Sequence, residues 1–246
     1  PLEQFEVTNL ISLNAPIFGY LNLTLTNLGL YSLIVFILVT SLHLAFKGTG
    51  SNDTKLIPSH WSIALESSFA SINAVVREQI GLRNEIYLPF IYSLFFFILI
   101  ANLVGNVPYS FTITTSIILS VGLSFTIYIG VTIIGLTKHG LHFFSFFIPS
   151  GTPLALVPLL VLIELTSNLA RALSLGVRLF ANMVAGHTLL KILSTFLYQL
   201  FSSSLIVAVV TLIPFSIFIA LIGLELAVGV IQSYVFILLT SSYIKD

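Results

Sequence analysis

The sequence has no cysteine, so disulfides, thiolate metal sites and catalysis by a thiol are all excluded. Its five histidines are scattered, without the HxxH or HExxH spacing of a metal site. No GxxxxGKS or GxxxxGKT segment is present, so any ATP chemistry would belong to partner proteins. The net charge is zero and no basic block occurs, which argues against nucleic acid as a partner. We therefore expect no cofactor and no enzymatic activity from this chain alone.

Charged residues are scarce, at 7% of the chain against 57% hydrophobic residues, and the mean hydropathy is +1.09. This leaves too little polar surface to cover a water-soluble globule, so the composition predicts an integral membrane protein. The chain begins PLEQFEVTNL, without an initiator Met. Trimming of a short leader and an incomplete sequence would explain that start equally well.

Five apolar runs are long enough to cross about 30 Å of hydrocarbon, which takes about 20 helical residues. An N-terminal segment, 1–27, precedes the first run, 28–46. Two more runs predict a helical hairpin over 87–136, and the last two predict a longer hairpin over 153–244. We expect one membrane domain, 1–246, that is all-α, with about five membrane-embedded helices plus one amphipathic surface helix.

The amphipathic helix is predicted over 59–80. Its apolar residues recur every three or four positions, with polar residues on the other face. It is too polar to cross a membrane. It either lies on one membrane face as a docking surface or covers the other spans as a lid, and the sequence leaves both alternatives open.

Isolated polar residues inside the apolar runs have two readings. Asn102 and Asn106, four residues apart near the turn of the first hairpin, either line a wet cavity or satisfy backbone and helix contacts. His43, near the end of the first run, is expected at the membrane interface.

The second hairpin is too long to stand upright in a membrane. Continuous helix over 153–200 would measure roughly 70 Å, more than twice the hydrocarbon thickness. Pro158 and Pro214 could kink the starts of its two runs, but no Pro or loop-like cluster interrupts 161–200. This favours a strongly tilted antiparallel hairpin over a broken helix.

Three charged residues of this hairpin, Glu164, Arg171 and Arg178, follow each other at intervals of seven, so they share one helical face. Arg178 cannot deprotonate, and a charge at the centre of a membrane helix costs about 2.5–3.5 kcal/mol. Glu164 and Arg171 have two equally good explanations: an ion network that only neutralises the arginines, or a functional role.

His187 lies half a helical turn away from Arg178 and about 13 Å further along the axis. Taken alone, it is best explained by snorkelling to the interface beside Lys191. Folding the hairpin about residue 205 pairs polar groups of its two runs: His187 with Glu225, Arg178 with Gln232, and Glu164 with Asp246. These pairs favour a functional site.

The chemistry of these pairs indicates proton transfer. Histidine and glutamate exchange protons, whereas Arg178 does not, so a proton cannot pass straight through the arginine. A membrane carboxylic acid, neutral in lipid and ionised beside Arg178, could carry the proton around it. No such carrier is evident in this chain, so a partner would have to supply it.

Cations outside the spans all fall on one side under the alternating topology. The N-terminus and the turns at 105–110 and 201–204 carry none. The positive-inside rule then places 47–86, 137–152 and the C-terminus on the matrix or cytoplasmic side. The cations are Lys47, Lys55, Arg77, Arg83, Lys138 and Lys245.

Five motifs resemble subunit a of the F-type ATP synthase, in its mitochondrial, fungal-like form, over essentially the whole chain. They are YxxIVFILVTSLH, FILIANLVGNVPYSF, GLTKHGLHFFSFFIPSGTPLALVPLLVLIE, ARALSLGVRLFANMVAGH and LELAVGVIQSYVFILLTSSYIKD. The resemblance implies a mitochondrial inner-membrane protein whose long hairpin lies tilted against the c-ring. It also implies contacts with peripheral-stalk subunit b and other small Fo subunits.

The resemblance assigns roles to single residues. Arg178 would be the stator arginine facing the ring carboxylate, with Asn182 and Gln232 near it. His187 and Glu225 would belong to the half-channel open to the intermembrane space, and Glu164, together with Asp246, to the matrix half-channel. Bacterial relatives carry a carboxylate at the position of His187 and a histidine at the position of Glu225. This exchange keeps an acid beside an imidazole.

Two other functions compete with this one. A self-contained proton or ion channel or secondary transporter would be expected to show inverted repeats and paired broken helices, which the sequence does not. A structural scaffold would leave Arg178, His187 and Glu225 without a purpose.

Overall fold

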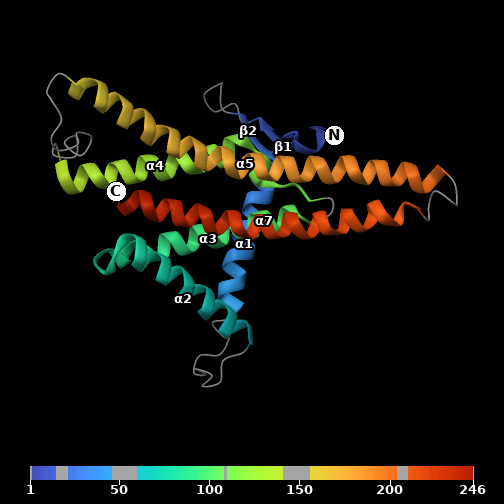
Figure 1. The fold of residues 1–246 in the computed structure, drawn as a ribbon, viewed down its shortest axis with the longest axis horizontal. Helices are drawn as coiled ribbons and strands as arrows, with labels where there is room; N and C mark the ends of the chain where they lie inside the picture. The colour runs from blue at the N-terminus through green and yellow to red at the C-terminus, as the bar shows by residue number, and fades with distance from the viewer. Residues whose placement is uncertain are drawn as a thin grey trace.

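Helices dominate the computed structural model, which describes residues 2–14, 22–45, 60–107, 110–140, 156–203 and 210–245 (Figure 1). The helices are α1 Asn27–Ala45, α2 His60–Ile80, α3 Leu88–Gly105, α4 Ile117–His139, α5 Val157–Ser203 and α7 Leu212–Lys245, with short 3₁₀ turns η1 Leu2–Phe5, η2 Leu82–Tyr87 and η3 Ile113–Thr115. Within the described residues, α1, α3, α4, α5 and α7 are long and apolar enough to cross a membrane. The predicted fold class is therefore confirmed.

Proline marks the start of three of these helices. Pro89, Pro158 and Pro214 each lie in the first turn of α3, α5 and α7, where proline's missing N–H leaves no helical hydrogen bond unmade. A turn at Thr211 separates Val210 from α7, and residues 204–209 lie outside the described part of the chain, so the suggested kink of this run at Pro214 stays a prediction. α5 is one continuous helix, although it bends along its length (Figure 1).

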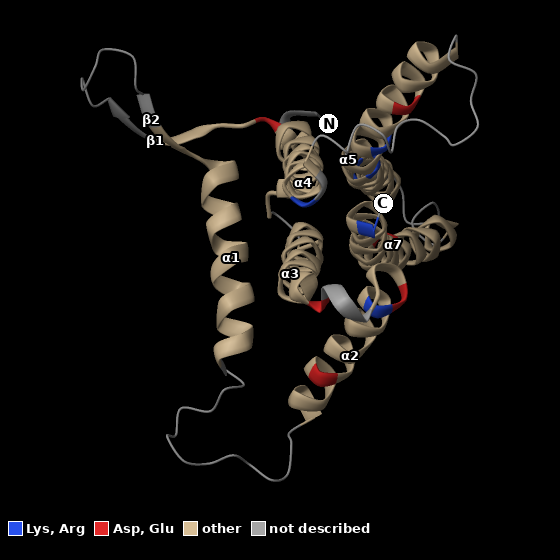
Figure 2. Ribbon diagram, turned by 90° about the vertical axis from the view of Figure 1, so that its left-hand side faces the viewer, with Lys and Arg blue, Asp and Glu red and all other residues tan. Residues whose placement is uncertain are grey.

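The two long helices, α5 and α7, lie side by side and antiparallel (Figure 1). α4 packs along α5 and α3 packs along α7. Figure 2 shows these four helices nearly end-on and α1 lengthwise to one side of them, where α1 packs on α3. The Tyr243 hydroxyl donates a hydrogen bond of 3.2 Å to the Arg171 carbonyl near the open end of the α5–α7 hairpin. Figure 2 also shows how sparse charged positions are on the long helices.

The buried core lies where α2, α3, α4, α5 and α7 meet. Between membrane helices such cores are stabilised mainly by close van der Waals packing. The core residues are Ile72, Val76, Ile91, Leu94, Ile98, Ile127, Leu175, Leu179, Phe236 and Ile237.

The amphipathic helix α2 divides into two halves. Its second half supplies Ile72 and Val76 to the core and ends at an ion pair between Arg77 and Glu85, with Nε and Oε1 2.9 Å apart. Its first half exposes 69% of Trp61 and 49% of Ile63. The lid alternative thus describes the second half, and the docking alternative stays a prediction for the first.

α4 and α5 approach each other closely at Gly176. A Cβ there would clash with the Ser124 hydroxyl and lie 2.8 Å from Val121 Cα and 2.9 Å from the Ser120 carbonyl oxygen. Small residues allow membrane helix backbones to approach this closely.

A small antiparallel hairpin, β1 Asn9–Asn14 with β2 Asn22–Thr26, stands in the N-terminal segment, where no strand was predicted. Alternation of Leu23 and Leu25 with polar neighbours was the available signal. The Asn27 side chain accepts a hydrogen bond from Thr8 N–H, 3.3 Å, and donates one to the Glu6 carbonyl, 3.0 Å. These bonds fix the N-terminal segment to the start of α1.

Candidate functional site

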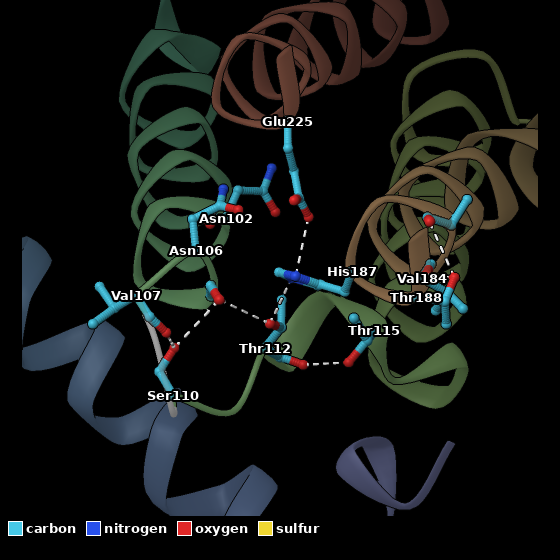
Figure 3. Close-up of polar contacts among 12 residues, drawn as sticks. Asn102, Asn106, Val107, Ser110, Thr112, Thr115, Val184, His187, Thr188 and Glu225 are labelled. Carbon is cyan, nitrogen blue, oxygen red and sulfur yellow. Dashed lines mark hydrogen bonds and ion pairs between the residues drawn. The ribbon is translucent and has the colours of Figure 1, made fainter. Parts of the chain in front are cut away.

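An ionisable pair joins the two long helices. His187 Nδ1 on α5 lies 3.0 Å from Glu225 Oε1 on α7, and the two side chains are only 15% and 5% exposed (Figure 3). The absence of a side chain at Gly186 makes room for the carboxylate, because a Cβ there would lie 2.8 Å from Oε1. The contact between His187 and Glu225 that the hairpin register predicted is confirmed. The register itself differs slightly, because Glu225 lies opposite residues 186 and 187, whereas residue 185 was expected.

Two further residues contact the imidazole, and the sequence did not indicate either. The Thr112 hydroxyl oxygen lies 2.9 Å from His187 Nε2, and the Phe5 ring centroid lies 6.5 Å from that of His187. Thr112 precedes η3 and Phe5 ends η1, so the N-terminal segment and the link between α3 and α4 both reach α5 here.

Asn102 on α3 and Asn106, which follows the last residue of α3, form the neighbouring part of this polar region (Figure 3). Asn102 is fully buried and donates a hydrogen bond of 3.1 Å to the Gly229 carbonyl of α7. Asn106 donates one of 3.2 Å to the Asn102 carbonyl. These bonds support the backbone-contact alternative. The Asn102 side-chain oxygen and both Glu225 carboxylate oxygens are also buried without a well-aligned donor, and ordered water commonly satisfies such atoms.

Arg178 lies in a different environment on the same helix. It is exposed and, with Arg171, lines an open cavity of about 470 Å³ between α5 and the C-terminal part of α7, which contributes Tyr243. Arg171 Nη2 lies 3.7 Å from Glu164 Oε1, with both side chains almost half exposed. The ion-pair alternative for Glu164 and Arg171 therefore has a contact to support it.

The remaining predicted residues are less tightly placed. Asn182 and Gln232 are half-buried, and among the described residues no hydrogen bond joins Gln232 to Arg178. Asp246 lies outside the described residues, so its pairing with Glu164 stays a prediction. No cluster of three His, Asp or Glu suited to a metal occurs in the part of the chain that the structure describes.

These features define a predominantly helical, multi-pass membrane protein with a buried acid–imidazole pair between two long antiparallel helices. The family model of the ATP synthase A chain matches residues 29–245. The chain is 67% identical over 246 residues to ATP synthase subunit a of Mycosarcoma maydis, covering 100% of this chain and 95% of the relative. It is 49% identical over 247 residues to that of Emericella nidulans, covering 100% and 94%. The chain belongs to the ATP synthase A chain family.

Proposed function

We propose that this chain is the proton-translocating stator subunit of an F-type ATP synthase. Two offset aqueous half-channels deliver protons to, and remove them from, carboxylates on a ring of c subunits. Arg178 prevents direct leakage between the half-channels, so that proton flow drives ring rotation and ATP synthesis. The chain itself is not catalytic, since ATP chemistry belongs to partner subunits.

The observation that carries this proposal is the separation of two polar regions on α5. His187 pairs with Glu225, whereas Arg178 lines an open cavity with Arg171 and Tyr243. Nine residues separate Arg178 from His187, about 13 Å along the helix. Arg178 is the α5 residue of the open cavity nearest to His187, and it blocks a direct proton path because arginine cannot release its proton.

The two half-channels have different residues. His187 and Glu225 line the half-channel open to the intermembrane space, and the buried oxygens of Glu225 and Asn102 support a wet environment there. Asn182 and Gln232 lie toward the arginine. Glu164, Arg171 and Asp246 belong to the matrix half-channel, and the open cavity at Arg171 supports this.

The partners and orientation follow from the same proposal. Residues 1–246 form one membrane domain in the mitochondrial inner membrane, in contact with lipid, the c-ring, peripheral-stalk subunit b and other small Fo subunits. The N-terminus faces the intermembrane space and the C-terminus faces the matrix, as the one-sided distribution of Lys and Arg supports.

A self-contained proton channel or secondary transporter is the alternative, and reconstitution separates the two. The purified chain is placed in vesicles alone, and the assembled complex is placed in matched vesicles, with proton flux measured under the same gradient. We expect flux from the complex and background flux from the chain alone. Equal flux per chain in both preparations would contradict the stator function and favour a self-contained channel.

A further inference from the structure

We propose that Thr112 is a positioning residue that fixes the tautomer of His187, so that the exchangeable proton lies at Nδ1, facing Glu225. This inference rests on the proposed function, because it describes how the acid–imidazole pair handles a proton. Thr112 is buried, with 5% of its surface exposed, and does not itself titrate.

The geometry around the Thr112 hydroxyl gives its single proton two acceptors to choose between. Its oxygen lies 2.9 Å from His187 Nε2 and 3.3 Å from the Gly105 carbonyl oxygen (Figure 3). A hydroxyl donates one proton but accepts through two lone pairs. Both contacts are hydrogen bonds only if Thr112 donates to Gly105 and accepts from a protonated Nε2.

The end of α3 favours this arrangement. Gly105 is the last residue of α3, and carbonyls in the last turn of a helix lack partners within the helix and carry partial negative charge. Glycine is needed there, because a Cβ would lie 2.7 Å from the Thr112 hydroxyl oxygen. The Thr115 hydroxyl donates a hydrogen bond of 2.6 Å to the Thr112 carbonyl and holds its backbone in place.

A neutral His187 with its hydrogen on Nε2 has no hydrogen on Nδ1, which lies 3.0 Å from Glu225 Oε1, and rotation of the carboxyl group would align the two atoms for proton transfer. A proton then moves from the protonated carboxyl to Nδ1: the O–H bond breaks, the N–H bond forms, and an imidazolium–carboxylate pair results. The reverse transfer restores both neutral groups. With the other tautomer, Nδ1 already carries a hydrogen and cannot accept the proton. Thr112 thus makes His187 a proton acceptor for Glu225.

Few other titratable groups lie close enough to His187 to affect its protonation. In the described part of the chain, Glu225 of α7 is the titratable group facing the ring, and Lys191 stands one turn further along α5. Phe5 of η1, Thr112 and the Asn102–Asn106 face of α3 carry no titratable group.

The test compares Thr112→Val, which removes the hydroxyl, with Thr112→Ser, which keeps it, in the assembled complex. Proton flux is measured as pH on the His187 side is varied over about pH 5–8, the range in which histidine titrates. At a pH low enough to protonate both ring nitrogens, the tautomer does not matter. We expect Thr112→Val to match the unmodified complex there and to fall below it at the alkaline end by a factor between about two and ten, because one hydrogen bond changes the ratio of the two tautomers by about tenfold.

Thr112→Ser should restore the profile. Thr240→Val, which removes a buried α7 hydroxyl that donates to the Phe236 carbonyl of the same helix, should lower flux equally at every pH or not at all. A pH-independent loss, or no loss, in Thr112→Val at normal assembly would overturn the inference. If Thr112→Val does not assemble, nitrogen-15 NMR of the unmodified complex with labelled histidine identifies the tautomer of neutral His187. A hydrogen on Nε2 is the result expected, and a hydrogen on Nδ1 would overturn the inference.

Glu225→Ala separates this inference from the proposed function. If flux requires Glu225 but ignores Thr112, the positioning role alone is wrong. If flux persists without Glu225, the proposed half-channel is wrong.

Discussion

Gly186 decides whether the Glu225 carboxylate reaches His187. We expect Gly186→Ala to force the two apart, because the added Cβ would lie 2.8 Å from Glu225 Oε1 and 3.1 Å from its carboxyl carbon. Overpacking of this kind costs about 1–3 kcal/mol. Proton-driven ATP synthesis in membranes should therefore fall about tenfold or more, while assembly is reduced less.

Gly130→Ala is the matched control for this change. Gly130 lies in α4, and a Cβ there meets nothing within 4 Å. It should leave synthesis unchanged. Full synthesis by Gly186→Ala would show that the His187–Glu225 contact is dispensable.

Asn102 provides a second prediction for a single side chain. Asn102→Leu removes the 3.1 Å hydrogen bond to Gly229 across α3 and α7, and such bonds in membrane proteins contribute about 0.6 kcal/mol on average and up to about 1.7. Thermal dissociation of the purified complex should begin at a lower temperature. Asn106→Leu should have a smaller effect, because its amide bonds only to a carbonyl of its own helix. An equal loss from both variants would contradict the assigned contact.

The central pair of the site could be predicted from sequence, whereas its surroundings could not. His187 and Glu225 stand out as rare ionisable residues in long apolar runs, and one turn joins those runs, so the register followed from the turn's position. Thr112 and Phe5 come from distant segments, and nothing in helical periodicity links them to His187. Gly186 lacked a signal as well, because only the position of the carboxylate shows why a side chain is excluded there.

Among helix pairs, α4 and α5 depend most directly on one small residue. Gly176→Ala should push these helices apart, because the new Cβ would meet the backbone of Ser120 and Val121, which cannot rotate away. Destabilisation of about 1–3 kcal/mol is expected, measured as a lower dissociation temperature and less assembled complex. Gly122→Ala in α4 adds a methyl group in open space and should change neither quantity. Unchanged stability in Gly176→Ala would mean that the crossing is looser than 2.8–2.9 Å contacts imply.

Helix boundaries could be predicted well because hydropathy and proline mark them. The first run was expected over 28–46 and is observed as Asn27–Ala45, and the amphipathic helix was expected over 59–80 and is observed as His60–Ile80. The β1–β2 hairpin was missed, because its strands are short and the segment reads as polar overall. A lid over the other spans was one of two alternatives for α2, since amphipathicity does not say what covers an apolar face; the contact with α7 in particular was not predicted.

At the scale of the whole molecule, α1 lies to one side of α3, α4, α5 and α7 and runs crosswise to them (Figures 1 and 2). If α1 spans the membrane upright, all four of the others must lie steeply tilted. Length predicted this only for α5 and α7, because α3 and α4 are short enough to span the bilayer directly. The tilt of α3 and α4 follows from packing along the long hairpin, which hydropathy does not encode.

The central claim is that Arg178 separates two proton paths because it keeps its charge. Arg178→Lys in the assembled complex tests it most directly, with ATP synthesis measured under an imposed proton gradient alongside the amount of complex. Lysine keeps a positive charge in water but can deprotonate in an apolar site, and it lacks the planar donor geometry of arginine. We predict normal assembly with synthesis reduced to background. Synthesis by the lysine variant at the unmodified rate would contradict the account.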